Sequence, residues 1–296
     1  MTFAGVIARA GSQLLARLPL PWIATLSGGV AQLGWWLAKS RRNVALTNLR
    51  LCFPHKSEAE REIIARTHFR AYVQAALEHG FLWNASGERI RAYVSLHDEF
   101  EWKKFRTGDE QRPVIWLCPH FIGLDSAAIR ISVDTSGCSL YSEQSNPDID
   151  AMMLAGRTRF GESKIIARTE GVKPIIRAMK SGLPFYYLPD MDFGLRDSVF
   201  VPFFGVNAAT ITGVSRLAKL THAAVVPVIV TQRPKGAGYD VRFYPAFENF
   251  PSGDDVADAK TVNEFIEHRV LENIPQYLWT HKRFKTRPPG EKSVYG

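Results

Sequence analysis

The chain has 296 residues, with 37 Lys and Arg against 29 Asp and Glu, so its formal net charge is +8. This length fits one large domain or two small ones, and no Gly/Ser-rich or Pro-rich linker divides it. The excess of positive charge indicates an anionic partner such as nucleic acid, a membrane surface or an acidic protein. No helix-turn-helix, zinc-finger or aromatic-basic ribonucleoprotein pattern is present, which argues against nucleic acid.

The amino-terminal region carries an uncharged run over residues 18–38, bracketed by Arg17 and Lys39. A run of this length could span a bilayer core of roughly 30 Å, although prolines and glycines dilute its apolar character. The Trp35-Trp36 pair fits an interfacial anchor better than a cleaved signal peptide. We therefore expect residues 1–40 to form a membrane-anchoring helix, either spanning the bilayer or lying in its plane. The excess of cationic residues after the run places residues 41–296 on the cytoplasmic side.

The next segments alternate between helical and strand-like patterns. Apolar residues at helical spacing predict a long helix over residues 58–83, and further helices are predicted at 148–160, 171–180 and 210–220. Short apolar runs predict strands at residues 114–118, 138–142, 164–167, 185–188, 225–230 and 240–244. Strands separated by helices predict an α/β fold with a mostly parallel sheet flanked by helices. Ligands bind beyond the carboxyl ends of the strands in such sheets, where His120 and Asp190 are expected to share one cleft.

The first candidate site residues are His120, which follows a predicted strand and Pro119, and Asp125, which opens a predicted helix. Two positions five residues apart on one regular helix point about 140° apart, so the pair requires His120 to lie on the preceding loop. Asp125 would then accept a hydrogen bond from one imidazole nitrogen, and the other nitrogen would act as a general base. Gly123 between them would let a substrate approach the backbone. The alternative is a chance pair on the surface.

Cysteines and metal ligands offer weaker signals. Cys52, Cys118 and Cys138 show no Cys-x-x-Cys spacing, which predicts buried free thiols. Cys118 stands two residues before His120, but an inert thiol in a buried strand is favoured over a Cys–His nucleophile. No second His or Cys stands near His120 at ligand spacing, so neither a metal nor another cofactor is predicted.

Further motifs follow in a fixed order along the chain. They are Tyr-Ser-Glu-Gln-Ser-Asn-Pro at 141–147, Arg-Thr-Arg-Phe-Gly at 157–161, Tyr-Leu-Pro-Asp-Met-Asp at 187–192, Phe-Val-Pro-Phe-Phe-Gly at 200–205 and Tyr-Leu-Trp-Thr-His-Lys-Arg-Phe-Lys at 277–285. Together with an early block at 42–54, this set resembles the bacterial lipid A late acyltransferases over nearly the whole chain. That family usually carries Glu where this chain has Asp125, whereas the related glycerolipid acyltransferases carry Asp.

The resemblance implies an O-acyltransferase whose catalytic domain is formed by residues 41–296, at the cytoplasmic face of the inner membrane. It implies transfer of a fatty acyl chain from acyl carrier protein to a 3-hydroxyacyl chain of a lipid A precursor, with His120 and Asp125 as the catalytic pair. It also implies substrate-binding residues, namely Asn146, Arg157, Arg159 and Asp190. The arginine fork suits a phosphate. The alternatives are a solvated basic face for the arginines and a structural turn for Asp190.

Two other functions stay open from the sequence. Asp125 in place of Glu leaves room for a lysophospholipid or another glycolipid as the acceptor. A membrane-anchored lipid-binding protein without turnover is a third possibility, although such a protein would have no need of a base. The basic carboxyl-terminal stretch, which includes Lys282, Arg283 and Lys285, is expected to dock acyl carrier protein or lipid headgroups, with a plain soluble tail as the alternative.

Overall fold

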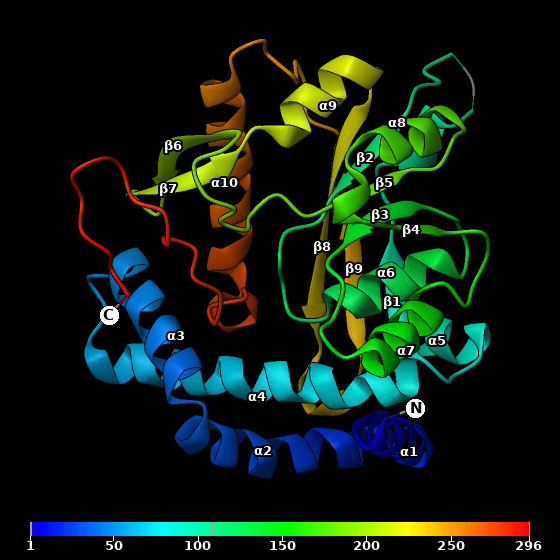
Figure 1. Ribbon diagram of the computed structural model, residues 1–296, viewed down its shortest axis with the longest axis vertical. Coiled ribbons are helices and arrows are strands. Elements are labelled where there is room, and N and C mark those ends of the chain that lie inside the picture. Colours follow the sequence, from blue (N-terminus) through cyan, green and yellow to red (C-terminus); the bar gives the residue numbers. More distant parts are fainter. Residues whose placement is uncertain (1, 108, 296) are drawn as a thin grey trace.

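The computed structural model describes residues 2–107 and 109–295 (Figure 1). Within these residues, seven strands form one sheet in the order β1-β9-β8-β2-β5-β3-β4, and β6 and β7 form a separate hairpin. The strands are β1 (Val94–His97), β2 (Val114–Leu117), β3 (Cys138–Tyr141), β4 (Lys164–Ala167), β5 (Phe185–Tyr187), β6 (Ser198–Phe203), β7 (Val206–Ile211), β8 (Ala224–Gln232) and β9 (Tyr239–Phe243).

The sheet is mostly parallel, as predicted. β8, β2, β5, β3 and β4 run in one direction, and β9 pairs antiparallel to β8. Each of the six predicted strands is present, with its ends shifted by no more than a residue or two. β1 and the β6–β7 hairpin were not predicted. The hairpin also shortens the predicted helix at 210–220, because residues through Ile211 pair as a strand.

The helices flank this sheet and extend below it. They are α1 (Phe3–Arg17), α2 (Leu20–Leu37), α3 (Lys39–Cys52), α4 (Glu58–Leu82), α5 (Gly87–Tyr93), α6 (Leu124–Ser132), α7 (Pro147–Arg157), α8 (Lys173–Lys180), α9 (Gly213–Thr221) and α10 (Asp255–Glu272). α6 packs on β1, β8 and β9, and α8 packs on β3 and β4. The α/β fold with a mostly parallel sheet and flanking helices is therefore confirmed.

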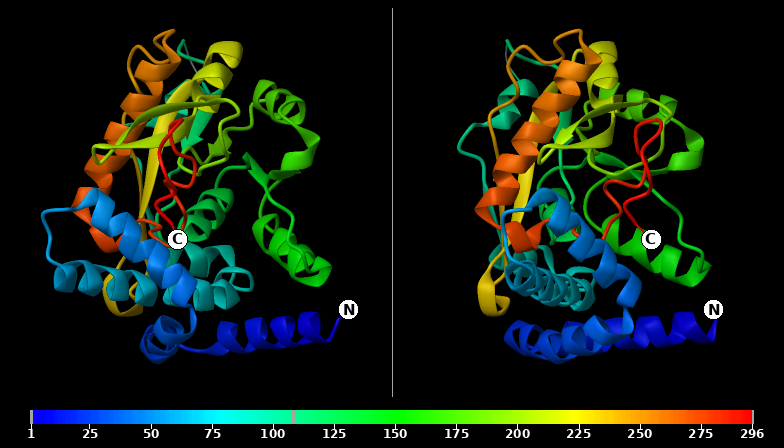
Figure 2. Two further views of the ribbon diagram at one scale, coloured as in Figure 1. Left: turned by 60° about the vertical axis from the view of Figure 1, so that its left-hand side comes forward. Right: turned by 90° about the vertical axis from the view of Figure 1, so that its left-hand side faces the viewer.

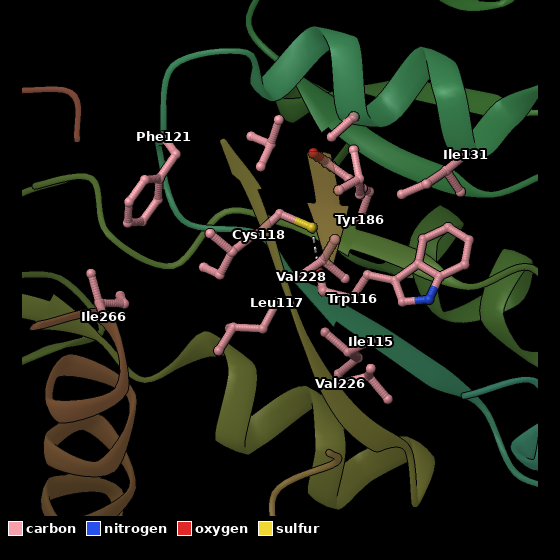
Figure 3. Close-up of a cluster of buried hydrophobic side chains, with 14 of the residues drawn as sticks. Ile115, Trp116, Leu117, Cys118, Phe121, Ile131, Tyr186, Val226, Val228 and Ile266 are labelled. Carbon is pink, nitrogen blue, oxygen red and sulfur yellow. Dashed lines mark hydrogen bonds between the residues drawn. The ribbon is translucent and has the colours of Figure 1, made fainter. Parts of the chain in front are cut away.

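β2 lies in the middle of the sheet and of the core (Figure 3). All four of its side chains are buried, which explains its uninterrupted apolar sequence, since both faces of a central parallel strand are covered. Trp116 packs edge-on against Trp102, at 4.9 Å between ring centroids. This rigid strand carries the loop that follows it, beginning at the buried Cys118.

The amino-terminal segment corrects the expectation of a transmembrane helix. Residues 1–40 do not form one helix, because α1 ends at Arg17 and α2, which holds most of the uncharged run, begins at Leu20 after Pro19. No helix among the described residues is both long and apolar enough to cross a membrane. Instead, α1 and α2 lie beneath α4 at one end of the molecule, as all views show (Figures 1 and 2). The domain boundary at residue 40 stays a prediction.

Candidate active site

His120 and Asp190 form the centre of the candidate site. β2 and β5 are parallel neighbours, so the residues that follow them emerge at the same edge of the sheet. The Nδ1 of His120 donates to Oδ1 of Asp190 at 2.7 Å, and the backbone N–H of His120 donates to Oδ2 at 2.9 Å. His120 and Asp190 therefore meet at one edge of the sheet, although Asp190 is buried beneath His120 and does not itself line the hollow that His120 lines.

These two hydrogen bonds fix the state of both side chains. Burial would raise the pKa of Asp190, but the charge and hydrogen bonds of His120 outweigh it and lower that pKa to about 2. In the neutral tautomer that donates Nδ1–H to the ionised Asp190, the lone pair of the His120 ring lies on Nε2. That nitrogen makes no hydrogen bond with any other described residue, and His120 lines an open hollow. The neutral ring held in this orientation has the arrangement that a general base requires.

Asp125 does not accept from His120, and the expected pairing was wrong. Asp125 lies in the first turn of α6, where Nε2 of His79 binds its Oδ2 at 2.8 Å. Nε and Nη2 of Arg157 bind its two oxygens at 2.9 Å each. Its carboxylate is therefore occupied by two cationic partners from α4 and α7. The sequence spacing placed His120 and Asp125 near one another but could not decide which carboxylate the imidazole meets.

Asp125 binds both His79 and Arg157 in one cluster, and its charge favours the protonated form of His79. Burial would lower the pKa of His79, but the hydrogen bond and charge of Asp125 raise it. Its Nδ1 also lies 3.2 Å from the carbonyl oxygen of Ala76, so both ring nitrogens face oxygen acceptors, as in an imidazolium. Burial would raise the pKa of Asp125, but Arg157 and His79 hold it far below its usual value. One carboxylate thus faces two cations.

Gly123 is required by close packing rather than by substrate access. It caps the start of α6 with φ +91°, in the left-handed region. A Cβ added there would lie 2.4 Å from the ring of Tyr239. That ring is fixed, since the Tyr239 hydroxyl donates to Glu78, which also accepts from Tyr93 at 2.7 Å. The space next to Gly123 is therefore filled by a held side chain, contrary to the expectation.

Two hollows meet at the start of α6. One lies between α4 and the loop after β2, and His79, His120 and Asp125 all line it. The other runs beneath α6 between β3, β4 and β5, with a mostly apolar lining that includes Trp116, Ile129 and Leu140. Leu124 and Asp125 line both. An apolar slot thus begins next to the cluster that flanks His120.

The other predicted substrate-binding residues differ in their positions. Asn146 caps α7, where its side-chain oxygen accepts from the backbone N–H groups of Asp148 and Ile149. Arg159 donates to the carbonyl oxygen of Ala85 and lies over the ring of Phe160. Arg157 is the last residue of α7 and Arg159 lies beyond the end of the helix. The two side chains therefore reach different partners. The structure brings Arg157 to the site but not Arg159, although the sequence predicted both there.

The carboxyl-terminal basic stretch also requires a correction. Arg283 is only 1% exposed and donates to the carbonyl oxygen of Ala209 and to the Thr210 hydroxyl, each at 2.8 Å. It holds the β6–β7 hairpin and cannot dock a partner. Lys282 and Lys285 are exposed and stay available.

The expectations for cysteine were confirmed. All three cysteines are free and buried, and burial raises the pKa of Cys118 well above its usual value, which makes it a poor nucleophile. No cluster of metal-ligating side chains occurs in the part of the chain that the structure describes.

Sequence reasoning missed two histidines at the site. His79 stands within a long helix, and nothing in the local pattern distinguishes it from a surface residue. His281 belongs to the Trp-x-His motif, and its ring lies nearly parallel to that of His120, with centroids 6.5 Å apart. Burial lowers the pKa of His281 to about 3, so it is neutral beside the pair of His120 and Asp190. The Trp-x-His motif was the sequence signal that could have identified His281 as a site residue.

Comparison with known proteins assigns the family. The family described as "Bacterial lipid A biosynthesis acyltransferase" matches residues 1–286. The lipid A biosynthesis lauroyltransferase of Escherichia coli is 32% identical, covering 95% of this chain and 91% of that protein. The lipid A biosynthesis myristoyltransferase of the same organism is 35% identical, covering 98% of this chain and 88% of that protein. The chain belongs to the bacterial lipid A biosynthesis acyltransferase family.

Proposed function

We propose that this protein transfers a fatty acyl chain from acyl carrier protein to a hydroxyl of a lipid A precursor, with His120 as the general base. The observation that carries the mechanism is the hydrogen bond between Nδ1 of His120 and Asp190, which leaves Nε2 without a partner among the described residues at an open hollow. Family membership supports the class of reaction and the lipid acceptor.

In the proposed reaction, Nε2 of His120 takes the proton of the acceptor hydroxyl. At the same time the hydroxyl oxygen attacks the carbonyl carbon of the thioester. The tetrahedral intermediate then collapses, breaks the carbon–sulfur bond and releases the carrier thiol, which takes the proton back from the imidazolium. Asp190 stabilises the imidazolium and holds the ring. A positioned base of this kind contributes about 10²–10⁴-fold to the rate.

We assign the apolar slot beneath α6 to an acyl chain, because it shares the lining residues Leu124 and Asp125 with the hollow beside His120. The proposed role of Asp125 is to hold His79 and Arg157 in place beside this slot. The cluster's excess positive charge suits a phosphate of the acceptor. Nη1 of Arg157 makes no hydrogen bond with the described residues, so it is the group that would meet that phosphate.

We further propose that the protein acts at the cytoplasmic face of the inner membrane and docks through α1 and α2 lying in the membrane plane. Large apolar side chains are exposed on both helices, among them Leu14, Trp22, Leu33 and Trp36. An apolar helix face rimmed by cations is typical of in-plane docking. Exposed Lys282 and Lys285 are proposed to meet the acidic acyl carrier protein.

Mass spectrometry of lipid A tests the reaction directly. Lipid A from cells lacking the gene should be lighter by one acyl chain than lipid A from the same cells with the gene restored. Cells restored with His120→Ala at equal protein level are the matched control and should keep the lighter form. Identical lipid A spectra with and without the gene would contradict the acceptor assignment.

A further inference from the structure

A groove between α2 and α4 is separate from the candidate active site. Gly28, Gln32 and Trp35 of α2 line one side, and Arg66 and Arg70 of α4 line the other. His79 of the active site stands on the same helix as Arg70, but the rise of 1.5 Å per residue places them about 14 Å apart along it.

The two arginines present their guanidinium groups to this groove. The Arg66 guanidinium lies over the ring of Trp35, at 4.3 Å from its centroid, and pairs with Glu62 at 2.7 Å. The guanidinium of Arg70 lies across Gly28, whose added Cβ would be 3.8 Å from its Cζ. Arg70 pairs with no acidic group in the described part of the chain. The groove therefore holds an excess of positive charge.

The outer face of α2 is apolar. The helix has no charged residue over Leu20–Leu37. Its buried side chains, such as Ile23 and Ala31, face α4, whereas Trp22 is 68% and Leu37 is 73% exposed. The exposed face therefore points away from the body of the protein, below α4 (Figure 2). A continuous apolar surface of this kind marks an interaction site.

We infer that the groove binds the phosphate of an anionic phospholipid in the bilayer on which α2 rests. This inference rests on the in-plane docking proposed above. An in-plane helix buries its apolar face about 5–10 Å into the boundary between headgroups and acyl chains, and packed helices lie about 8–10 Å apart. The arginines of α4 then stand at the depth of the phosphates.

The chemistry of the groove fits that ligand. A guanidinium offers two parallel N–H donors to a phosphate, and the stacking on Trp35 holds the Arg66 group in place. The amide of Gln32 lines the same groove and offers further donors. Because the groove opens beside the docking face and lies away from His120, a bulk phospholipid suits it better than the reacting acceptor.

Vesicle binding tests the inference. Full-length protein is partitioned onto phosphatidylcholine vesicles with and without phosphatidylglycerol, as wild type and as the double variant Arg66→Gln/Arg70→Gln. The matched control is Arg177→Gln/Lys180→Gln, which removes equal charge from exposed positions on α8 at the far end of the molecule (Figure 1). Each basic residue at an anionic surface contributes about fivefold, so the groove variant should lose about 25-fold on anionic vesicles. The control should lose less than about threefold, because its residues lie away from the surface.

Other results would overturn the inference. An equal loss in the control variant would show a general effect of net charge, and no loss in the groove variant would show that no headgroup binds there. A raised KM of the groove variant for the phosphorylated acceptor in neutral detergent micelles would assign the groove to the acceptor instead. Wild-type protein that binds neither vesicle would contradict in-plane docking, whereas acyl transfer in micelles tests the proposed reaction separately.

Discussion

Replacing Asp190 by Asn is the sharpest perturbation of the proposed site. The carboxylate is 1% exposed and accepts both from Nδ1 of His120 at 2.7 Å and from its backbone N–H at 2.9 Å. An amide of nearly equal volume removes the charge that stabilises the imidazolium and can present an N–H group to Nδ1, which favours the wrong tautomer. We expect kcat to fall by about 10²–10⁴-fold, which corresponds to about 2.7–5.4 kcal/mol of transition-state stabilisation.

The assay is the steady-state rate of acyl transfer from acyl carrier protein to the lipid A precursor in micelles, with the melting temperature recorded for each variant. Asp192→Asn is the matched control, because Asp192 is also buried but binds Thr286 rather than His120. It should lose stability and keep kcat within a few-fold. A folded Asp190→Asn protein with wild-type kcat would refute the role of Asp190 and reopen the pairing of His120.

The remaining predictions concern the surroundings of the site. His79→Gln should lower the melting temperature most near pH 6 and least near pH 9. Folding raises the pKa of His79, so the contribution of His79 to stability is full below about pH 6.5 and is lost as pH rises through the raised pKa. A deficit that does not change with pH would show that no titrating pair is involved. Gly123→Ala should reduce both activity and stability, since its Cβ would meet the Tyr239 ring at 2.4 Å, and normal turnover and melting would contradict the packing argument. Lys282→Glu/Lys285→Glu should raise the KM for the acyl carrier protein thioester more than that for a coenzyme A thioester, and equal effects on both donors would indicate a structural role for these lysines.

The sequence predicted the sheet well because buried parallel strands are apolar throughout and are separated by amphipathic helices. The short β1 and the β6–β7 hairpin escaped prediction. β6 contains Pro202, which disfavours a strand prediction, and the hairpin packs on α10 and is held by Arg283, which lie far along the chain. Contacts between segments so far apart produce no recognisable pattern in the local sequence.

The sequence predicted His120, Asp125, Arg157 and Asp190 at the site, but not how they pair, and the predicted Asn146 and Arg159 bind backbone groups elsewhere. His120 and Asp190 could be placed at one sheet edge, because both follow predicted parallel strands. The partner of Asp125 could not be predicted. His79 lies on α4, and the position of α4 against α6 is set by tertiary packing rather than by local sequence. The spanning alternative for the amino-terminal segment fails for a related reason. A hydropathy run cannot show whether one face of a helix is already covered, as α4 covers α2.

The measurement that tests the central claim most directly is single-turnover acyl transfer by purified His120→Ala protein. Wild-type and variant proteins are mixed with acyl carrier protein thioester and lipid A precursor in micelles, and the acylated product is followed by mass spectrometry. The account predicts a rate at least about 10²-fold lower for the variant, with a melting temperature that stays above the assay temperature and unchanged binding of acyl carrier protein. A folded variant that transfers the acyl chain at the wild-type rate would contradict His120 as the base.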